Sequence, residues 1–111
     1  MAYNGRMVII ETSVFTRQIT RLVNDDSYRA LQQELARNPE AGDVIPHSSG
    51  LRKIRWPSST RGKRGGIRVI YWRHAQDETI YMLLAYGKGE KDDLSAVELK
   101  TLRRLVLEEL S

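Results

Sequence analysis

The sequence predicts a single α+β domain over residues 1–111. Apolar side chains recur at helical spacing before residue 40 and again after Ser95, whereas residues 51–86 are rich in β-branched and aromatic side chains. Because these helical and strand-like segments occupy separate stretches, the expected order is strand, helix, helix, three strands and helix, which defines the α+β class. A chain of 111 residues is long enough to bury one modest core.

A short strand and two helices are expected first. Residues 7–11, MVIIE, are apolar and β-branched and suit a buried strand. Thr12 or Ser13 then offers an N-cap for a helix whose apolar residues recur at helical spacing. We expect Ser27 to cap a second helix, which Pro39 ends. The short polar break between the two helices predicts an antiparallel helical hairpin.

Three strands are expected next, arranged as an antiparallel meander. Each is rich in β-branched and aromatic residues, and turn residues separate one from another. A segment of glycine, serine and basic residues, 57–66, joins the first of these strands to the second. The three strands are predicted at residues 51–56, 67–73 and 79–86.

A C-terminal helix is expected after the polar segment GKGEKDD, residues 87–93. Ser95 and Glu98 have the spacing of a capping box, in which each side chain binds a backbone N–H group of the other residue. Apolar residues from Leu99 to Leu110 then form one stripe of an amphipathic helix.

The composition narrows the possible classes of protein. The chain is 41% apolar and 29% charged, as in ordinary globular domains, and no apolar run is long enough to cross a membrane. The N-terminus lacks the apolar middle of a secretory signal, so we expect a cytoplasmic protein without a membrane partner. The absence of cysteine excludes disulfides and thiolate metal sites, and His47 and His74 cannot form a metal site alone. We therefore expect no metal and no other cofactor.

Basic residues are concentrated in one acid-free segment, from Val44 to Gln76. Eight of the 18 Lys and Arg residues lie there and contribute +8, while the other ten against 14 acids give 10 − 14 = −4. Such segregation focuses a positive potential on one region, and polyanions respond to that potential rather than to net charge. The segment therefore predicts a nucleic-acid partner.

Within this segment, three bases occupy strand positions. Lys53 and Arg55 alternate with Ile54 and Trp56 at strand period, which predicts one basic and one apolar face. Arg68 lies in the following strand, where an apolar residue is the usual choice. We expect these three bases to form a basic sheet face.

Other candidate contacts lie in loops or at a strand end. A basic glycine-rich loop is either an RNA or ribosome contact or only a solvated connection. Tyr86 ends its strand beside Gly87-Lys88, where an aromatic ring is a candidate for stacking on an RNA base. The loop bases concerned are Arg61, Lys63 and Arg64.

Bases of this kind are suited to RNA cleavage. Arginine holds phosphate through paired donors, and arginine or lysine stabilises the charge that develops on phosphorus. The RNA itself supplies a nucleophile, because its 2′-hydroxyl attacks the adjacent phosphate once it is positioned. A two-metal nuclease needs carboxylates at the phosphate, and the basic segment has none.

Several segments, taken in order, resemble the RelE/ParE superfamily of bacterial toxins. These are LRKIRW, a Gly/Lys/Arg loop, GIRVIYW and YGKGEKDDL, followed by a final helix. The sequence is most similar to the HigB-like branch, in which segments like NPEAGDVI and GKRGGIRVIY occur in the same order. The resemblance covers nearly the whole chain, most strongly residues 31–94.

The resemblance implies an α+β fold in which two N-terminal helices pack on a curved antiparallel sheet, with a C-terminal helix. It further implies the toxin of a type II toxin-antitoxin pair, a metal-independent endoribonuclease that cuts mRNA in the ribosomal decoding site and stops translation. The partners would be a cognate antitoxin protein, the ribosome and mRNA.

The resemblance also suggests roles for individual residues. The matching KIR segment gives phosphate contacts at Lys53 and Arg55, and GIR gives the main transition-state arginine at Arg68. The GK element after the last strand gives Lys88 as a further positively charged catalytic residue that holds the RNA. In RelE another arginine follows this lysine and a tyrosine lies several residues on, whereas this chain has Gly89 and then Ser95 near those positions.

Two other functions are compatible with the same residues. A ParE-like toxin shares the fold but inhibits DNA gyrase and cuts no RNA, so the basic segment would then bind protein or DNA. A non-catalytic RNA-binding or ribosome-binding module would show salt-sensitive binding without cleavage.

Overall fold

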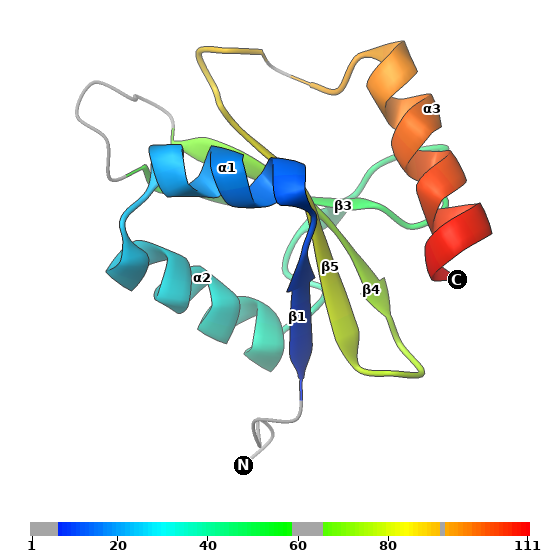
Figure 1. Ribbon diagram of the computed structural model, residues 1–111, viewed down its shortest axis with the longest axis horizontal. Coiled ribbons are helices and arrows are strands. Elements are labelled where there is room, and N and C mark those ends of the chain that lie inside the picture. Colours follow the sequence, from blue (N-terminus) through cyan, green and yellow to red (C-terminus); the bar gives the residue numbers. More distant parts are fainter. Residues whose placement is uncertain (1–6, 59–65, 92) are drawn as a thin grey trace.

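A computed structural model describes residues 7–58, 66–91 and 93–111 and confirms the α+β class (Figure 1). Arg61, Lys63 and Arg64, which were expected to contact RNA or the ribosome, lie outside the described residues. The strands form one five-stranded sheet in the order β1-β5-β4-β3-β2. The elements are β1 (Val8–Glu11), α1 (Ser13–Leu22), α2 (Asp25–Arg37), β2 (Asp43–Val44), β3 (Arg52–Trp56), β4 (Ile67–His74), β5 (Thr79–Gly87) and α3 (Ala96–Leu105), which continues as a π-helical turn over Val106–Leu110.

The predicted meander of three strands is confirmed, and two further strands extend it. β3, β4 and β5 pair antiparallel, and the two-residue β2 adds to the outer edge of β3. β1 pairs with β5 in the parallel sense, with Val8 opposite Thr79 and Glu11 opposite Met82. The complete sheet is therefore mixed, because the N-terminal strand runs beside β5 after a long connection rather than through a tight turn.

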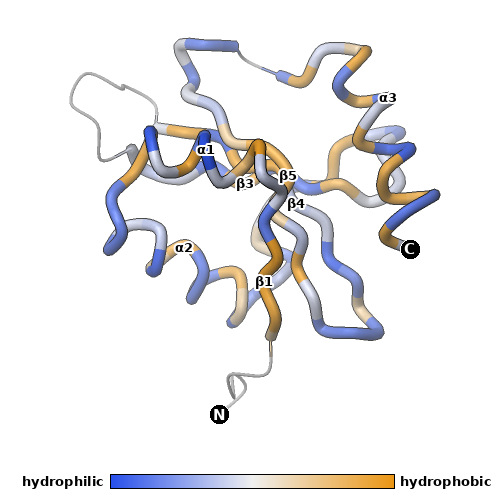
Figure 2. Tube along the Cα trace, viewed as in Figure 1, coloured by the Kyte–Doolittle hydropathy of each residue, from blue (hydrophilic) through white to orange (hydrophobic). Residues whose placement is uncertain are grey.

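The two faces of the sheet are covered by different helices (Figure 1). α1 and α2 cover one face, and their apolar stripes pack on it around Phe15, Leu31 and Tyr71. α3 covers part of the opposite face, where Leu102 and Val106 join Leu83 in a second cluster. Figure 2 shows the hydrophobic residues of the helices on the sides that face the strands. None of the helices in the described ranges is long and apolar enough to span a bilayer.

Hydrogen-bonding side chains fix where the helices begin. The Thr12 hydroxyl accepts a hydrogen bond from Phe15 N at 3.0 Å and caps α1, as predicted. The prediction that Ser27 caps α2 is wrong, because the Asn24 side chain accepts from Ser27 N at 2.8 Å and the helix begins at Asp25. This earlier start puts two aspartates in the first turn, where they complement the helix dipole. α3 has the predicted capping box of Ser95 and Glu98.

A register shift in the β4–β5 pairing determines which way the end of β5 faces. Ile70 lies opposite Leu84 but Tyr71 lies opposite Met82, so β5 has one extra residue there. A one-residue slip exchanges the two faces of a strand. Tyr81 and Leu83 face α3 before the shift, and Tyr86 faces α3 after it. Without the extra residue, the alternation would turn Tyr86 toward α1.

Side chains from the start of α1 satisfy the edge of β5 where β1 stops. Thr12 N donates to Met82 O at 3.0 Å, and the Thr12 hydroxyl donates to Leu83 O at 3.0 Å. Six residues further along, in the middle of α1, Gln18 Oε1 accepts from Ala85 N at 2.8 Å. α1 is thus hydrogen-bonded to the irregular part of β5, which stabilises the register shift.

The Tyr71 hydroxyl supplies a testable buried contact. It donates to Pro39 O at 2.7 Å and accepts from Gly42 N at 2.9 Å, and burial raises its pKa. We expect Tyr71→Phe to lower the free energy of unfolding by about 1–3 kcal/mol, because two buried backbone groups lose their partner. Urea unfolding would measure this. Tyr81→Phe, at a half-buried tyrosine, is the control, and equal midpoints for the two variants would contradict the prediction.

Candidate functional site

Lys53, Arg55 and Arg68 lie on one face of the sheet, the face that α3 partly covers. Arg55, Arg68 and Tyr86 are directly opposite one another across β3, β4 and β5. Lys53 lies in the next row, opposite Ile70. The alternating pattern of β3 is as expected, since Ile54 and Trp56 pack in the cluster on the other face. The register therefore brings two bases of β3 and one base of β4 into one site.

Arg68 is far less accessible than a residue on an open basic face. It is only 6% exposed, whereas Arg55 on the neighbouring strand is exposed and the Lys53 side chain is 23% exposed. Arg68 Nη1 is 3.4 Å from Ile67 O. The central position of β4 explains this burial, because strands flank Arg68 on both sides. A guanidinium in such a place acts in a lower dielectric and interacts more strongly with a phosphate than one in water.

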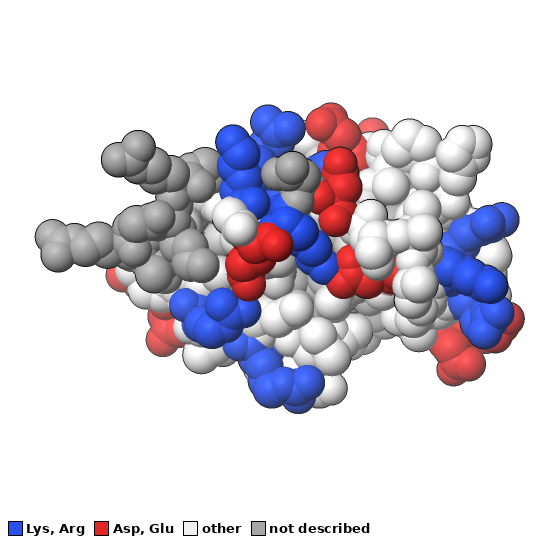
Figure 3. Space-filling view, turned by 90° about the horizontal axis from the view of Figure 1, so that it is seen from above, with Lys and Arg blue, Asp and Glu red and all other residues white. Residues whose placement is uncertain are grey.

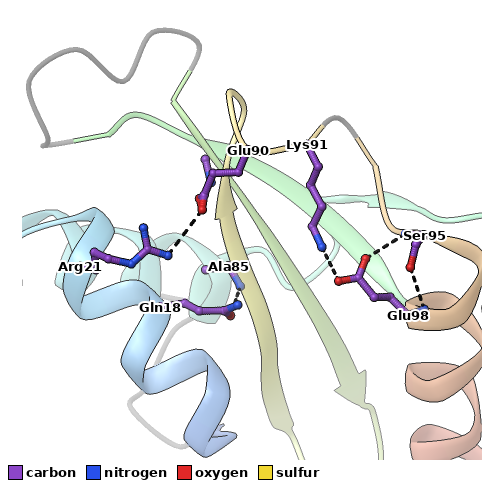
Figure 4. A network of polar contacts seen from close by, with 8 residues as sticks. Gln18, Arg21, Ala85, Glu90, Lys91, Ser95 and Glu98 are labelled. Carbon is purple, nitrogen blue, oxygen red and sulfur yellow. Dashed lines mark hydrogen bonds and ion pairs between the residues drawn. The ribbon is translucent and has the colours of Figure 1, made fainter.

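Tyr86 is buried beneath a lysine from the loop that follows β5. Its side chain is 3% exposed, and Lys91 Nζ lies 5.0 Å from the centre of its ring, a distance typical of a cation–π contact. Lys91 is also paired with Glu98 of α3, and this hydrogen bond lowers the pKa of Glu98 (Figure 4). The ring is therefore covered in this structure, and its predicted stacking on an RNA base stays a prediction.

Lys88 lies at the same end of the sheet. It follows Gly87, which is paired with Ile67 at the start of β4, and its side chain is exposed. Lys88 N donates to Gly66 O at 3.2 Å. Gly66 has a φ of +71°, and a Cβ there would lie 2.4 Å from Trp56 O, so only glycine fits this entry to β4. The backbone thus holds Lys88 close to the residue before Ile67 and Arg68.

An acidic residue that the sequence analysis did not single out lies on the basic face. Asp93 Oδ1 is 2.5 Å from Lys53 Nζ. The hydrogen bond from Lys53 lowers the pKa of Asp93, and the charges of Arg68 and Arg55 act in the same direction. Figure 3 shows acidic side chains directly beside basic ones at this end of the molecule. The only feature of the sequence that could have indicated this acidic contact was the pair of aspartates that closes the segment GKGEKDD.

The two histidines lie away from these bases. His74 ends β4, six residues beyond Arg68, and its Nδ1 is 3.6 Å from Asp77 Oδ2. His47 is exposed in the turn before β3. Within the described ranges, no three His, Asp or Glu side chains gather as a group that could hold a metal ion.

Comparison with known proteins identifies the fold. No family model matches the chain. A double mutant of Escherichia coli toxin RelE in the free state is 18% identical, with a TM-score of 0.55, over 93% of this chain and 95% of that one. The toxin-antitoxin complex RelBE2 from Mycobacterium tuberculosis matches with 17% identity and a TM-score of 0.54, over 74% of this chain and 91% of that one. The chain therefore has the fold of the RelE toxins, as the resemblance predicted.

The pairing of Asp93 with Lys53 can be tested by titration. We expect NMR to give a pKa for the Asp93 carboxyl below the ordinary aspartate range, and Lys53→Met to raise it. The folded-state pKa is depressed, so the ion pair is present at neutral pH and is lost as pH falls through that lowered pKa. Lys100→Met on the exposed side of α3 is the matched control. Identical Asp93 titrations in the wild type and Lys53→Met would contradict the pairing.

Proposed function

We propose that this protein is the toxin of a type II toxin-antitoxin pair, a HigB-like, ribosome-dependent endoribonuclease of the RelE kind. The observation that carries the proposal is the row of Arg55 and Arg68 across β3 and β4, with Lys53 beside it, on a RelE fold. Three bases on one face supply both binding and charge stabilisation for a phosphodiester.

The reaction follows from the chemistry of RNA. The 2′-oxygen forms a bond to the adjacent phosphorus while the bond from phosphorus to the 5′-oxygen breaks. The 2′-hydroxyl loses its proton, the 5′-oxygen gains one, and the products are a 2′,3′-cyclic phosphate and a 5′-hydroxyl. Negative charge grows on the non-bridging oxygens in the transition state, so a fixed cation at that point accelerates the step.

We assign the main stabilising role to Arg68. Its burial supports this role, because a guanidinium that is already held by the protein needs little reorganisation when charge develops beside it. Lys53 and Arg55 would hold the phosphate from β3, and Lys88 would hold it from the end of β5. Lys88 is exposed, as Arg55 is, and is suited to the flanking backbone of the RNA.

The proposed partners follow from the same assignment. The ribosome would present mRNA in an orientation that brings the 2′-hydroxyl into line. A cognate antitoxin is supported by the similarity to RelBE2, which is a toxin-antitoxin complex. Action on translating ribosomes places the protein in the cytoplasm.

Cleavage mapping in a translation extract tests the function. We expect the wild type to cut mRNA only when ribosomes are present, and Arg68→Met to cut at least about 10²-fold more slowly, since one transition-state cation is lost. Methionine keeps an apolar stem at this buried position, whereas alanine would also leave a void. Primer extension locates and quantifies the cuts.

Arg29→Met, on the exposed side of α2, is the matched control and should cut normally. Inhibited translation with intact mRNA would contradict the nuclease. Loss of gyrase supercoiling activity without RNA cleavage would instead identify a ParE-like toxin. Normal cutting by Arg68→Met would remove Arg68 from the mechanism.

A further inference from the structure

The basic face carries its own counter-ion in the free protein. Asp93 Oδ1 lies 2.5 Å from Lys53 Nζ, and the Asp93 side chain is 74% exposed while that of Lys53 is 23% exposed. A carboxylate oxygen and a phosphodiester oxygen are both anionic acceptors that pair with an ammonium group at this distance. Asp93 therefore holds the lysine that the proposed function needs for a phosphate.

The other bases of the site also act on Asp93. The charges of both Arg68 and Arg55 stabilise its ionised form. An anion at this place is thus attracted by all three bases of the sheet face. This pattern is the one that an RNA phosphate would meet, so the carboxylate marks the preferred position of an anion.

The loop that carries Asp93 is fastened on both sides of it (Figure 4). Before it, Glu90 Oε1 accepts from Gly87 N at 2.7 Å, and Glu90 Oε2 is 3.6 Å from Arg21 of α1. Lys91 is paired with Glu98 of α3, and Ser95 N donates to Glu98 Oε1 at 2.9 Å. The position of Asp93 near the basic face is therefore set by the fold.

We propose that Asp93 occupies a phosphodiester subsite at Lys53 and is displaced when RNA binds, so that this residue sets the affinity of the protein for RNA. The inference rests on the proposed function for the identity of the anion. An RNA phosphate must break the contact between Asp93 and Lys53, and repulsion from the displaced carboxylate opposes binding further. Removing the negative charge of Asp93 should accordingly strengthen RNA binding.

Binding of a fully 2′-O-methylated RNA oligonucleotide tests the competition without cleavage. Asp93→Asn is compared with Asp26→Asn, which has the same change in net charge and also removes an exposed ion pair, with Arg29 on α2. At about 0.1 M salt, fluorescence anisotropy should give a Kd about 2–5-fold lower for Asp93→Asn than for Asp26→Asn, the size expected for an exposed ion pair. The slope of log Kd against log salt should be the same for the two variants, because Lys53 contacts the same phosphate in both complexes once Asp93 is displaced.

A Lys53→Met background isolates the subsite. There Asp93→Asn should change the Kd less than it does in the wild type, because the lysine for which the carboxylate competes is gone. Equal affinities of Asp93→Asn and Asp26→Asn would overturn the inference. So would weaker binding by Asp93→Asn, which would mean that Asp93 orients Lys53 for RNA, and so would a lack of oligonucleotide binding by every variant.

The RNA-binding experiment tests the subsite, and the mRNA-cutting experiment tests the nuclease, so the two hypotheses can fail independently. Ribosome-dependent cutting by the wild type, with no effect of Asp93→Asn on RNA binding, would leave the proposed function intact and remove the competition. Tighter RNA binding by Asp93→Asn, with no cutting by the wild type, would establish the subsite in a protein that is not a nuclease.

Discussion

The register shift between β4 and β5 is the constraint that turns the end of β5 toward the candidate site. One extra residue in β5 turns Tyr86 to the face that carries Arg68, and places it directly opposite that arginine. The shift occurs where β1 ends and where α1 begins to satisfy the edge of β5 through Thr12 and Gln18. The start of α1, the end of β1 and the geometry of the site are therefore linked by a few hydrogen bonds between the backbone of β5 and side chains of α1 and its N-cap.

The fold places an acidic side chain beside basic residues that have no acidic neighbours along the chain. The basic segment was acid-free in sequence, yet the fold brings Asp93 from the β5–α3 loop to Lys53. The loop is held by Glu90 and Lys91, which connect it to α1 and α3. A site with an internal carboxylate is less attractive to arbitrary polyanions, and a substrate with several phosphate contacts is favoured over one with a single contact.

Local patterns allowed most of the fold to be predicted. Alternation in β3 separated Lys53 and Arg55 from Ile54 correctly because the period of a strand needs only neighbouring residues. The α2 start was misassigned since Asn24 and Ser27 are both good capping residues, and sequence alone gave no preference between them. The burial of Arg68, the β5 shift and the approach of Asp93 depend on pairings between distant segments, so periodicity could not reveal them.

The most direct test of the central claim concerns the nucleophile. A reporter mRNA would carry a single 2′-deoxynucleotide at one position that the wild type cuts in a translation extract, with the neighbouring codons unchanged. If Arg68 and the other bases bind the phosphate and stabilise its charge while the 2′-hydroxyl attacks, cutting should disappear at that position and continue elsewhere. Continued cutting at the deoxynucleotide would contradict the account, because the bond would then be broken by another nucleophile.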